Sequence, residues 1–241
     1  MKLTLFWSFT FCVGFVASAA TCAAETYAPF KPDMPSGAAY TLDALALHPT
    51  QFSTGQREIN YKRSKFDKMD RAEVTAYLQK KDVPVVVGPG GVPYLTDGHH
   101  TISALIACVH PDKTVYGHVL ANWSNLPAAD FWAKMQKQGY TFLRDSSGQM
   151  RSPIELPVSL NEMKPDPYRG LAWAVMQAEG FKEIKPPEIF FQEFYWADFF
   201  RDKITWDDTD NAAFALAVHK ALELAHSPAA AGLPGYVAAK D

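Results

Sequence analysis

The alternation of apolar and polar residues predicts a short hairpin followed by a helix near the middle of the chain. Residues 83–87 form a β-branched run, residues 88–91 break it with glycine and proline, and residues 92–95 resume it. This arrangement is typical of two strands joined by a turn. Residues 101–109 then carry apolar side chains at i, i+3, i+4 and i+7, which is the spacing of a helix. The pattern therefore places residues 97–100 at a strand-to-helix junction.

The remaining pattern predicts a compact α+β unit followed by a helical region. Helix, hairpin, helix and strand follow one another in the first unit, which favours a small mixed sheet with helices. Prolines then punctuate a loop-rich connector, and three helical patterns rich in aromatic residues follow as a cap. Outside the hairpin and its helix, the predicted elements are helices at 67–80 and 130–138, a strand at 114–121, and helices at 168–179, 188–203 and 208–226.

The chain is accordingly divided into five predicted segments. Its 241 residues, of which 48% are hydrophobic and 13% aromatic, suffice for a core in one domain with an appendage or in two small domains. The segments are a signal peptide at 1–24, an extended proline-rich arm at 25–40, an α+β domain at 41–139, a helical extension at 140–226 and a flexible tail at 227–241.

The first segment has the composition of a secretory signal peptide. Lys2 gives a short basic start, residues 3–16 are an apolar run, and small residues follow, with cleavage expected after Ala24. Cleavage after Ala19 or Ala20 remains open. So does an uncleaved membrane anchor, because the apolar run is nearly long enough to span a bilayer. The expected destination is the periplasm or the outside of the cell.

Removal of this segment changes both the cysteine count and the charge. Two of the three cysteines leave with it, so the mature chain keeps only Cys108 and can form no intramolecular disulfide. Cys108 lies in the apolar helix and is expected to be a small buried hydrophobe. Loss of Lys2 moves the formal net charge from −3 to −4. That balance does not favour the broad basic face of a DNA-binding protein.

The segment at 97–101, Asp-Gly-His-His-Thr, concentrates the chemistry of the chain. The first N–H groups of a helix lack partners and lie at the positive end of its dipole, so this junction favours an anion. Gly98 lets the backbone approach a ligand closely, and His99 and His100 add donors, proton carriers or metal ligands. The alternative is that Asp97 is only an N-cap, Gly98 only a turn residue, and the histidines ordinary surface side chains.

Together with other blocks, this segment resembles the ParB/sulfiredoxin superfamily, and within it the branch of ParB-like nucleases. In that superfamily the corresponding segment opens a helix and binds nucleotide phosphates, and the resemblance implies the same α+β fold here. In this segment sulfiredoxins have a cysteine, and chromosome-partitioning proteins have arginines. Neither is present, so neither sulfinic-acid repair nor the triphosphate clamp of the partitioning proteins is expected. The matching blocks are Pro-Thr-Gln at 49–51, Gly-Gln-Arg-Glu-Ile at 55–59 and Asp-Gly-His-His at 97–100, with further similarity at 166–173 and 194–200.

Handling of a phosphate group at this turn is the predicted chemistry. Gly98 and Thr101 are expected to hold phosphate oxygens. His99 or His100 would act as general acid, or would ligate a divalent ion such as Mg²⁺ or Mn²⁺ that polarises the phosphoryl group. Asp97 would orient one imidazole or ligate the same ion.

Further candidate residues lie upstream of the hairpin. Glu58 is the distant carboxylate expected to activate water or a hydroxyl nucleophile. By the resemblance, Gln51 and Arg57 would contact the substrate, while Lys62 and Lys65 belong to a basic cluster that could face an anion. From the sequence alone, Arg57 and Glu58 could instead be a solvated charge pair, and the basic cluster an ordinary surface.

The predicted function is hydrolysis of a phosphodiester or nucleotide, which makes the protein a nuclease or phosphoesterase. An exported protein meets little ATP or ADP, so hydrolysis is favoured over kinase action. The expected partner is a phosphate-containing small molecule or nucleic-acid fragment, and no chromosome-segregation partner is expected. The alternative is a non-catalytic envelope module that holds a phosphorylated ligand at the turn and docks a protein partner with its aromatic half.

Overall fold

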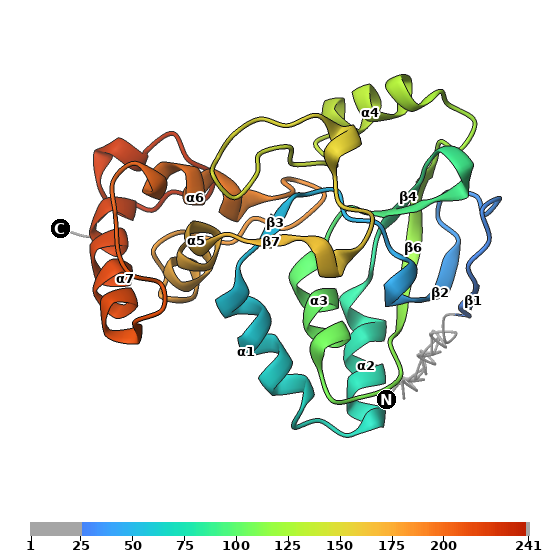
Figure 1. Ribbon diagram of the computed structural model, residues 1–241, viewed down its shortest axis with the longest axis horizontal. Coiled ribbons are helices and arrows are strands. Elements are labelled where there is room, and N and C mark those ends of the chain that lie inside the picture. Colours follow the sequence, from blue (N-terminus) through green and yellow to red (C-terminus); the bar gives the residue numbers. More distant parts are fainter. Residues whose placement is uncertain (1–25, 240–241) are drawn as a thin grey trace, which may run out of the picture.

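The computed structural model describes residues 26–239 (Figure 1). The predicted signal peptide lies outside the described residues. Within the described range, no helix is both long and apolar enough to cross a membrane.

A five-stranded mixed sheet forms the centre of the N-terminal half, in the order β1-β2-β6-β4-β5. The central β6 pairs antiparallel with β2 and parallel with β4, and β4 and β5 form the predicted hairpin. β1 pairs with β2, so part of the expected N-terminal arm is an edge strand. The strands are β1 (Ala28–Pro29), β2 (Ala39–Asp43), β4 (Val85–Val87), β5 (Pro93–Leu95) and β6 (Thr114–Asn122).

Three helices accompany this sheet, with α1 packed against α3 and α2 packed against β6, and Figure 1 shows them side by side. They are α1 (Gln56–Phe66), α2 (Arg71–Lys81) and α3 (His99–Ala107). Their apolar faces join the strands in one buried cluster, to which Leu78, Ile102 and Val119 belong. The predicted α+β fold class is thereby confirmed.

The start of α2 differs from the prediction, and the cause is a capping residue. Asp70 accepts a hydrogen bond from the N–H of Glu73 (2.9 Å), while the Glu73 carboxylate accepts one from the N–H of Asp70 (2.8 Å). This reciprocal capping box fixes the first helical residue at Arg71 instead of position 67.

α1 is a helix that the apolar pattern did not predict. Of its eleven residues only Ile59, Phe66 and Glu58 are buried, so the apolar signal is too sparse to identify the helix. The helix is held instead by packing against α3 and by contacts with α5.

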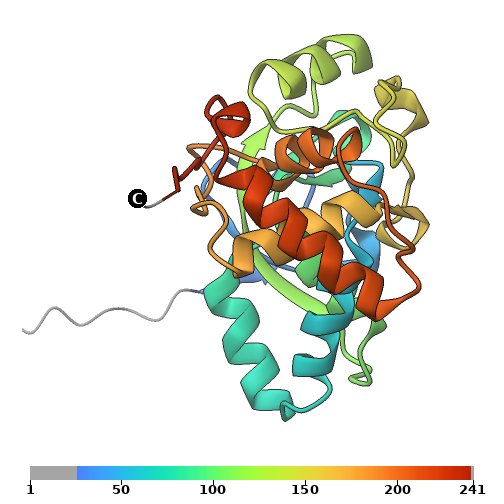
Figure 2. The same ribbon diagram turned by 90° about the vertical axis from the view of Figure 1, so that its left-hand side faces the viewer.

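The C-terminal half is helical around a second buried cluster. α5 (Pro167–Gln177), α6 (Gln192–Arg201) and α7 (Asn211–Ala225) surround Trp196 and Phe200, and Figure 2 shows α7 in front of the other two. The remaining elements are α4 (Ala128–Lys137), the parallel strands β3 (Ser53–Thr54) and β7 (Lys164–Pro165), and 3-10 turns at Ala44–Ala46, Pro89–Gly91, Pro153–Glu155, Leu160–Glu162 and Pro228–Ala230.

The segment after α7 is packed, which corrects the expected flexible tail as far as residue 239. Ala230 is fully buried, and the Trp196 indole N–H donates to the carbonyl of Pro234 (2.9 Å). Tyr236 forms a β-bridge with Phe181. The aromatic residues of the C-terminal half therefore also anchor the chain that follows them.

The two halves meet closely beside α1. β3 and β7 pair across more than a hundred residues of sequence. Gly55 approaches Gly170 so closely that a Cβ at position 55 would lie 2.9 Å from the Gly170 nitrogen. This contact brings the start of α1 and the start of α5 to the same place, where the candidate site lies.

Candidate functional site

A cleft of about 670 Å³ opens at this junction. It is lined by α1 and α2, by the 97–101 turn, and by residues of α5 and of the segment at 183–194. Six lysine and arginine side chains and five carboxylates line it, although the whole chain carries a formal net charge of −3. The cleft is therefore more basic than the chain as a whole.

The 97–101 turn starts α3 as the pattern predicted, and α3 includes both histidines. Gly98 is the N-cap residue with φ +89°, a left-handed conformation that favours glycine. Its carbonyl accepts the first helical hydrogen bond, from the N–H of Ile102 (2.9 Å). The N–H groups of the three residues between them lie in the first turn, where helical geometry provides no carbonyl partner.

His99 is buried and uncharged. Its Nε2 accepts a hydrogen bond from the backbone N–H of Thr50 (3.2 Å), so the ring proton is on Nδ1. Thr50 is itself fixed, because its hydroxyl donates to the carbonyl of Leu95 (2.7 Å). Burial, together with the nearby charge of Arg169, lowers the pKa of His99 to about 3.

His100 is held in the same way, by the backbone at the start of α1. Its Nε2 accepts from the backbone N–H of Gly55 (2.9 Å), which again places the proton on Nδ1. That Nδ1 lies 3.9 Å from a carboxylate oxygen of Glu58. It also lies 3.4 Å from Nη2 of Arg169, and two donors cannot hydrogen-bond to each other. Burial and the charge of Arg169 hold the pKa of His100 well below its ordinary value.

A buried chain of ion pairs surrounds the histidines. Glu58 Oε1 contacts Lys62 Nζ (2.6 Å), and Glu58 Oε2 contacts Arg169 Nη1 (3.0 Å). Arg169 continues through Nη2 to Glu193 Oε1 (2.9 Å), and Lys62 also donates to the Thr101 hydroxyl (3.0 Å). Two predicted site residues of α1 are thus joined to the turn and to two residues of the helical half.

The protonation of Glu58 follows from its partners. Burial alone would raise the pKa of this carboxyl, but Arg169 and Lys62 outweigh burial and hold the pKa below its ordinary value. Both carboxylate oxygens are occupied by cations. A carboxylate in this state is a weak base, so the geometry favours a positioning role for Glu58 over the predicted activation of water.

The other predicted site residues differ in how far they are exposed to the cleft. Asp97 lines the cleft and faces Lys81 at 3.9 Å. Lys65 also lines it, with its ammonium 4.4 Å from the ring centre of Tyr61. Gln51 borders the cleft but is almost fully buried, and its amide donates to the carbonyl of Ser53 (2.6 Å).

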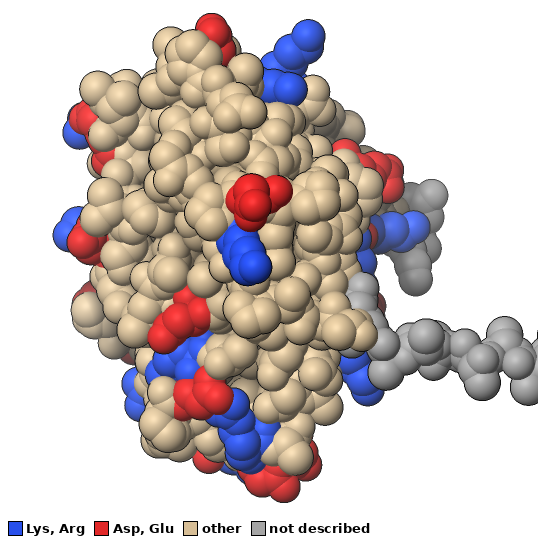
Figure 3. All heavy atoms as spheres, turned by 90° about the vertical axis from the view of Figure 1, so that its right-hand side faces the viewer, with Lys and Arg blue, Asp and Glu red and all other residues tan. Residues whose placement is uncertain are grey.

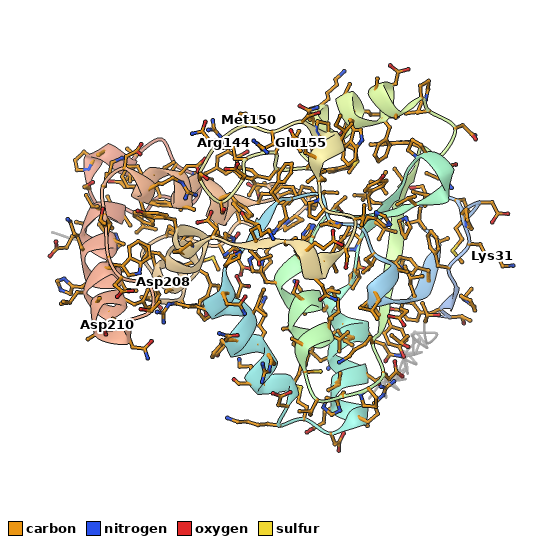
Figure 4. All side chains as sticks on the ribbon, viewed as in Figure 1. Lys31, Arg144, Met150, Glu155, Asp208 and Asp210 are labelled. Atoms are coloured by element: carbon orange, nitrogen blue, oxygen red, sulfur yellow. The ribbon has the colours of Figure 1, made fainter. Side chains whose placement is uncertain are left out.

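Arg57 is the exception, because its side chain is turned away from the cleft. Its Nε donates to the Asp208 carboxylate (2.9 Å) and its Nη1 to Asn211 (3.1 Å). The guanidinium lies over the ring of Phe214, 3.7 Å from its centre. Asp208 lies in the loop three residues before the first residue of α7, on the side of that helix nearer α1 (Figure 4). Arg57 therefore ties α1 to α7, which corrects the predicted substrate contact.

The donors expected for a divalent ion are not brought together. No group of three or more histidine, cysteine or acidic side chains that could hold a metal occurs within residues 26–239. Both oxygens of Glu58 are paired, and the Nε2 atoms of His99 and His100 accept backbone hydrogen bonds. Ligation of Mg²⁺ or Mn²⁺ would require these contacts to break.

Sequence reasoning assigned no role to Arg169 or Glu193. Both line the cleft, and Arg169 is only 4% exposed. Arg169 lies in the segment at 166–173 that contributes to the family resemblance, and Glu193 directly precedes the segment at 194–200. However, Arg169 is 111 residues from Glu58, and no local pattern indicates that they meet.

Comparison with known proteins agrees with this architecture. A family model described as "Putative ParB-like nuclease" matches residues 40–202. The crystal structure of protein Atu1540 from Agrobacterium tumefaciens is similar, with a TM-score of 0.72 and 31% identity, over 84% of this chain and 99% of that one. No curated protein matches the chain. The family match spans most of the chain and includes the whole cleft-forming core, and we conclude that the protein belongs to the ParB-like nuclease family, within the ParB/sulfiredoxin superfamily.

Proposed function

We propose that this protein hydrolyses a phosphate ester, as a phosphodiesterase, nuclease or nucleotide hydrolase, at the 97–101 turn. The observation that carries the proposal is the convergence of a helix N-terminus, two neutral imidazoles, Lys62 and Arg169 on one cleft. Membership of the family supports it.

The phosphate would lie against the first turn of α3. Its oxygens would accept hydrogen bonds from the backbone N–H groups of that turn, where the helix dipole is positive. Lys62 adds a cation that is already positioned by the Thr101 hydroxyl and by Glu58. Arg169 keeps one buried N–H, at Nε, without a hydrogen-bond partner among the described residues, and a phosphoryl oxygen could satisfy it.

The histidines would act as neutral hydrogen-bond donors. With a pKa of about 3, His99 carries no extra proton at neutral pH and is poorly suited to the general-acid role predicted for it. A neutral imidazole N–H can still polarise a phosphoryl oxygen, and Arg169 would stabilise the charge that develops there.

In the hydrolytic step, the oxygen of water attacks phosphorus and the ester P–O bond breaks. The proton released by the attacking water needs an acceptor. Glu193 lines the cleft and pairs with Arg169 through Oε1, whereas both oxygens of Glu58 contact cations. The Glu193 side chain is also 20% exposed, compared with 5% for Glu58. We assign Glu193 as that acceptor, while the leaving oxygen takes a proton from solvent.

A second candidate function is a non-catalytic module that binds a phosphorylated ligand or a protein partner. One observation favours it. Glu58 and both histidines, which were predicted to be catalytic, are already held by ion pairs or backbone hydrogen bonds. Neutral imidazoles held in this way can donate hydrogen bonds to a bound anion without transferring a proton, while Glu58 only positions Lys62 and Arg169.

Export to the periplasm or the outside of the cell remains part of the proposal, since it rests on residues 1–24. The proposal does not include a broad basic surface that binds DNA. On the face that Figure 3 shows, most charged side chains lie along the lower part and the edges, and acidic and basic ones are mixed there, so they form no purely basic patch.

The test is hydrolysis of bis-p-nitrophenyl phosphate, single-stranded DNA, RNA and nucleotides, with EDTA or with Mg²⁺, Mn²⁺ or Zn²⁺. Glu193→Gln should lower kcat by about 100-fold or more. The matched control Glu183→Gln, an exposed carboxylate of the same cleft, should leave kcat unchanged.

Absence of turnover in the wild type, with phosphate or nucleotide still raising Tm, would favour the binding module. Absence of both turnover and stabilisation would contradict both functions.

A further inference from the structure

We propose that Tyr61 and Trp173 form a binding site for the base of a nucleotide whose phosphate lies at the 97–101 turn. The inference rests on the proposed function for the position of the phosphate. It adds the residues that would contact the base, in a part of the cleft that the hydrolytic step does not use.

The spacing along α1 places the aromatic site next to the phosphate site. Glu58, Tyr61, Lys62 and Lys65 all line the cleft and follow one another at i, i+3, i+4 and i+7, so they share one face of the helix. This face extends about 10 Å along the helix axis. Tyr61 is the immediate neighbour of Lys62, whose ammonium contacts Thr101.

The two rings come from different halves of the chain. Tyr61 lies on α1 and Trp173 on α5, with ring centres 5.3 Å apart and planes inclined by 49°. Tyr61 is 45% exposed. Lys65 lies over the Tyr61 ring at 4.4 Å from its centre, so a base that stacks on this face would displace the ammonium and bring it next to the ligand. Aromatic rings next to basic side chains are the combination that binds single-stranded nucleotides, because every base has a face that stacks.

The lining of the cleft favours a nucleotide over a lipid. A long acyl chain requires continuous apolar contact, whereas six basic and five acidic side chains interrupt this lining. A volume of about 670 Å³ is more than a phosphate needs and lies in the usual range for sites that bind small organic ligands. A polar ligand with one flat ring fits both features.

The proposal also gives the helical C-terminal half a function. Trp173 and Arg169 both belong to α5, one turn apart. α5 would therefore supply one ring for the base and one cation for the phosphate, while α1 supplies the other ring and Lys62.

The test is calorimetric binding of adenosine monophosphate and ribose 5-phosphate, which differ by the base alone. The nucleotide should bind about 10-fold more tightly to the wild type. Tyr61→Ala and Trp173→Ala should reduce this ratio to about one, while Trp173→Phe should keep most of it. Tyr195→Ala, a similarly exposed tyrosine outside the cleft, is the control and should leave the ratio unchanged.

Tyr61 is exposed to solvent at 45%, so Tyr61→Ala should fold and keeps the test valid if Trp173→Ala fails to fold. Equal binding of the two probes to the wild type would refute the base site and leave the phosphate site intact. Binding of neither probe would overturn both proposals.

A single-stranded oligonucleotide forms a third arm. Tighter binding than the mononucleotide, lost in Tyr61→Ala, supports the base site with a nucleic-acid strand as the ligand. Binding no tighter, and still lost in Tyr61→Ala, supports the base site with a free nucleotide. Oligonucleotide binding that Tyr61→Ala leaves unchanged would contradict the base site.

Discussion

Mild acid should destabilise this fold through the two buried histidines. In the folded protein His99 and His100 stay neutral, because burial and the charge of Arg169 lower their pKa values. In the unfolded chain a histidine has a pKa near 6.5. Below that pH the unfolded chain binds protons that the folded protein does not, so the free energy of unfolding falls as the pH falls.

The magnitude follows from the pKa of about 3 for His99. Each pH unit between 6.5 and 3 costs about 1.4 kcal/mol for a group that stays neutral only in the folded state. At pH 5 the loss from His99 is therefore about 2 kcal/mol. His100 adds a loss of the same sign. Since domains are typically stable by about 5–15 kcal/mol, the effect should be large enough to measure.

The assay is urea unfolding followed by circular dichroism at pH 7, 6 and 5. The informative variant is His99→Gln, whose amide oxygen can accept the Thr50 N–H without titrating. Between pH 7 and 5 this variant should lose about 2 kcal/mol less than the wild type. A smaller slope should persist, because burial also lowers the pKa values of His100 and His48. His219→Gln, an exposed position on α7, is the control and should behave as the wild type does.

Equal losses in the wild type and His99→Gln would refute the reasoning. They would mean that His99 is solvated or charged in the folded protein, contrary to its burial and its hydrogen bond.

Three further substitutions test the packing around the site by urea unfolding at pH 7, and the third is also tested by titration with inorganic phosphate. Glu58→Gln removes one of the negative charges that pair with the buried guanidinium of Arg169, and it should lower the free energy of unfolding by about 3–5 kcal/mol. A loss below about 1 kcal/mol would contradict the buried chain of ion pairs. Gly117→Ala would place a Cβ 2.0 Å from the carbonyl oxygen of Val83 and should cost about 1–3 kcal/mol or more, so an unchanged stability would mean that β6 and Val83 do not approach this closely. Arg57→Ala should cost about 1 kcal/mol without changing ligand affinity, because Asp208 and not the ligand is its partner; a selective loss of affinity would restore its predicted substrate contact.

The features that the sequence predicted well are those with local signals. The hairpin is marked by a β-branched run that glycine and proline interrupt, and α3 by its apolar spacing. Together they place His99 and His100 at a helix start. The same local reasoning missed α1, whose stability depends on contacts with α3 and α5.

The parts that could not be predicted depend on partners distant in the sequence. Arg57 and Glu58 are consecutive, and the sequence left them as a possible solvated pair. In the structure they point to different partners, Arg57 to Asp208 and Glu58 to Arg169. Consecutive residues of a helix face directions about 100° apart, and only the tertiary packing decides what each direction meets.

The most direct test of the account is a titration of the protein with inorganic phosphate, monitored by the backbone amide signals in a ¹H–¹⁵N correlation spectrum. The account predicts that the amides of His99, His100 and Thr101 shift most, and that Lys62→Met weakens the binding that these shifts report. If the largest shifts occur away from the start of α3, or if Lys62→Met leaves the affinity unchanged, the 97–101 turn is not the phosphate site.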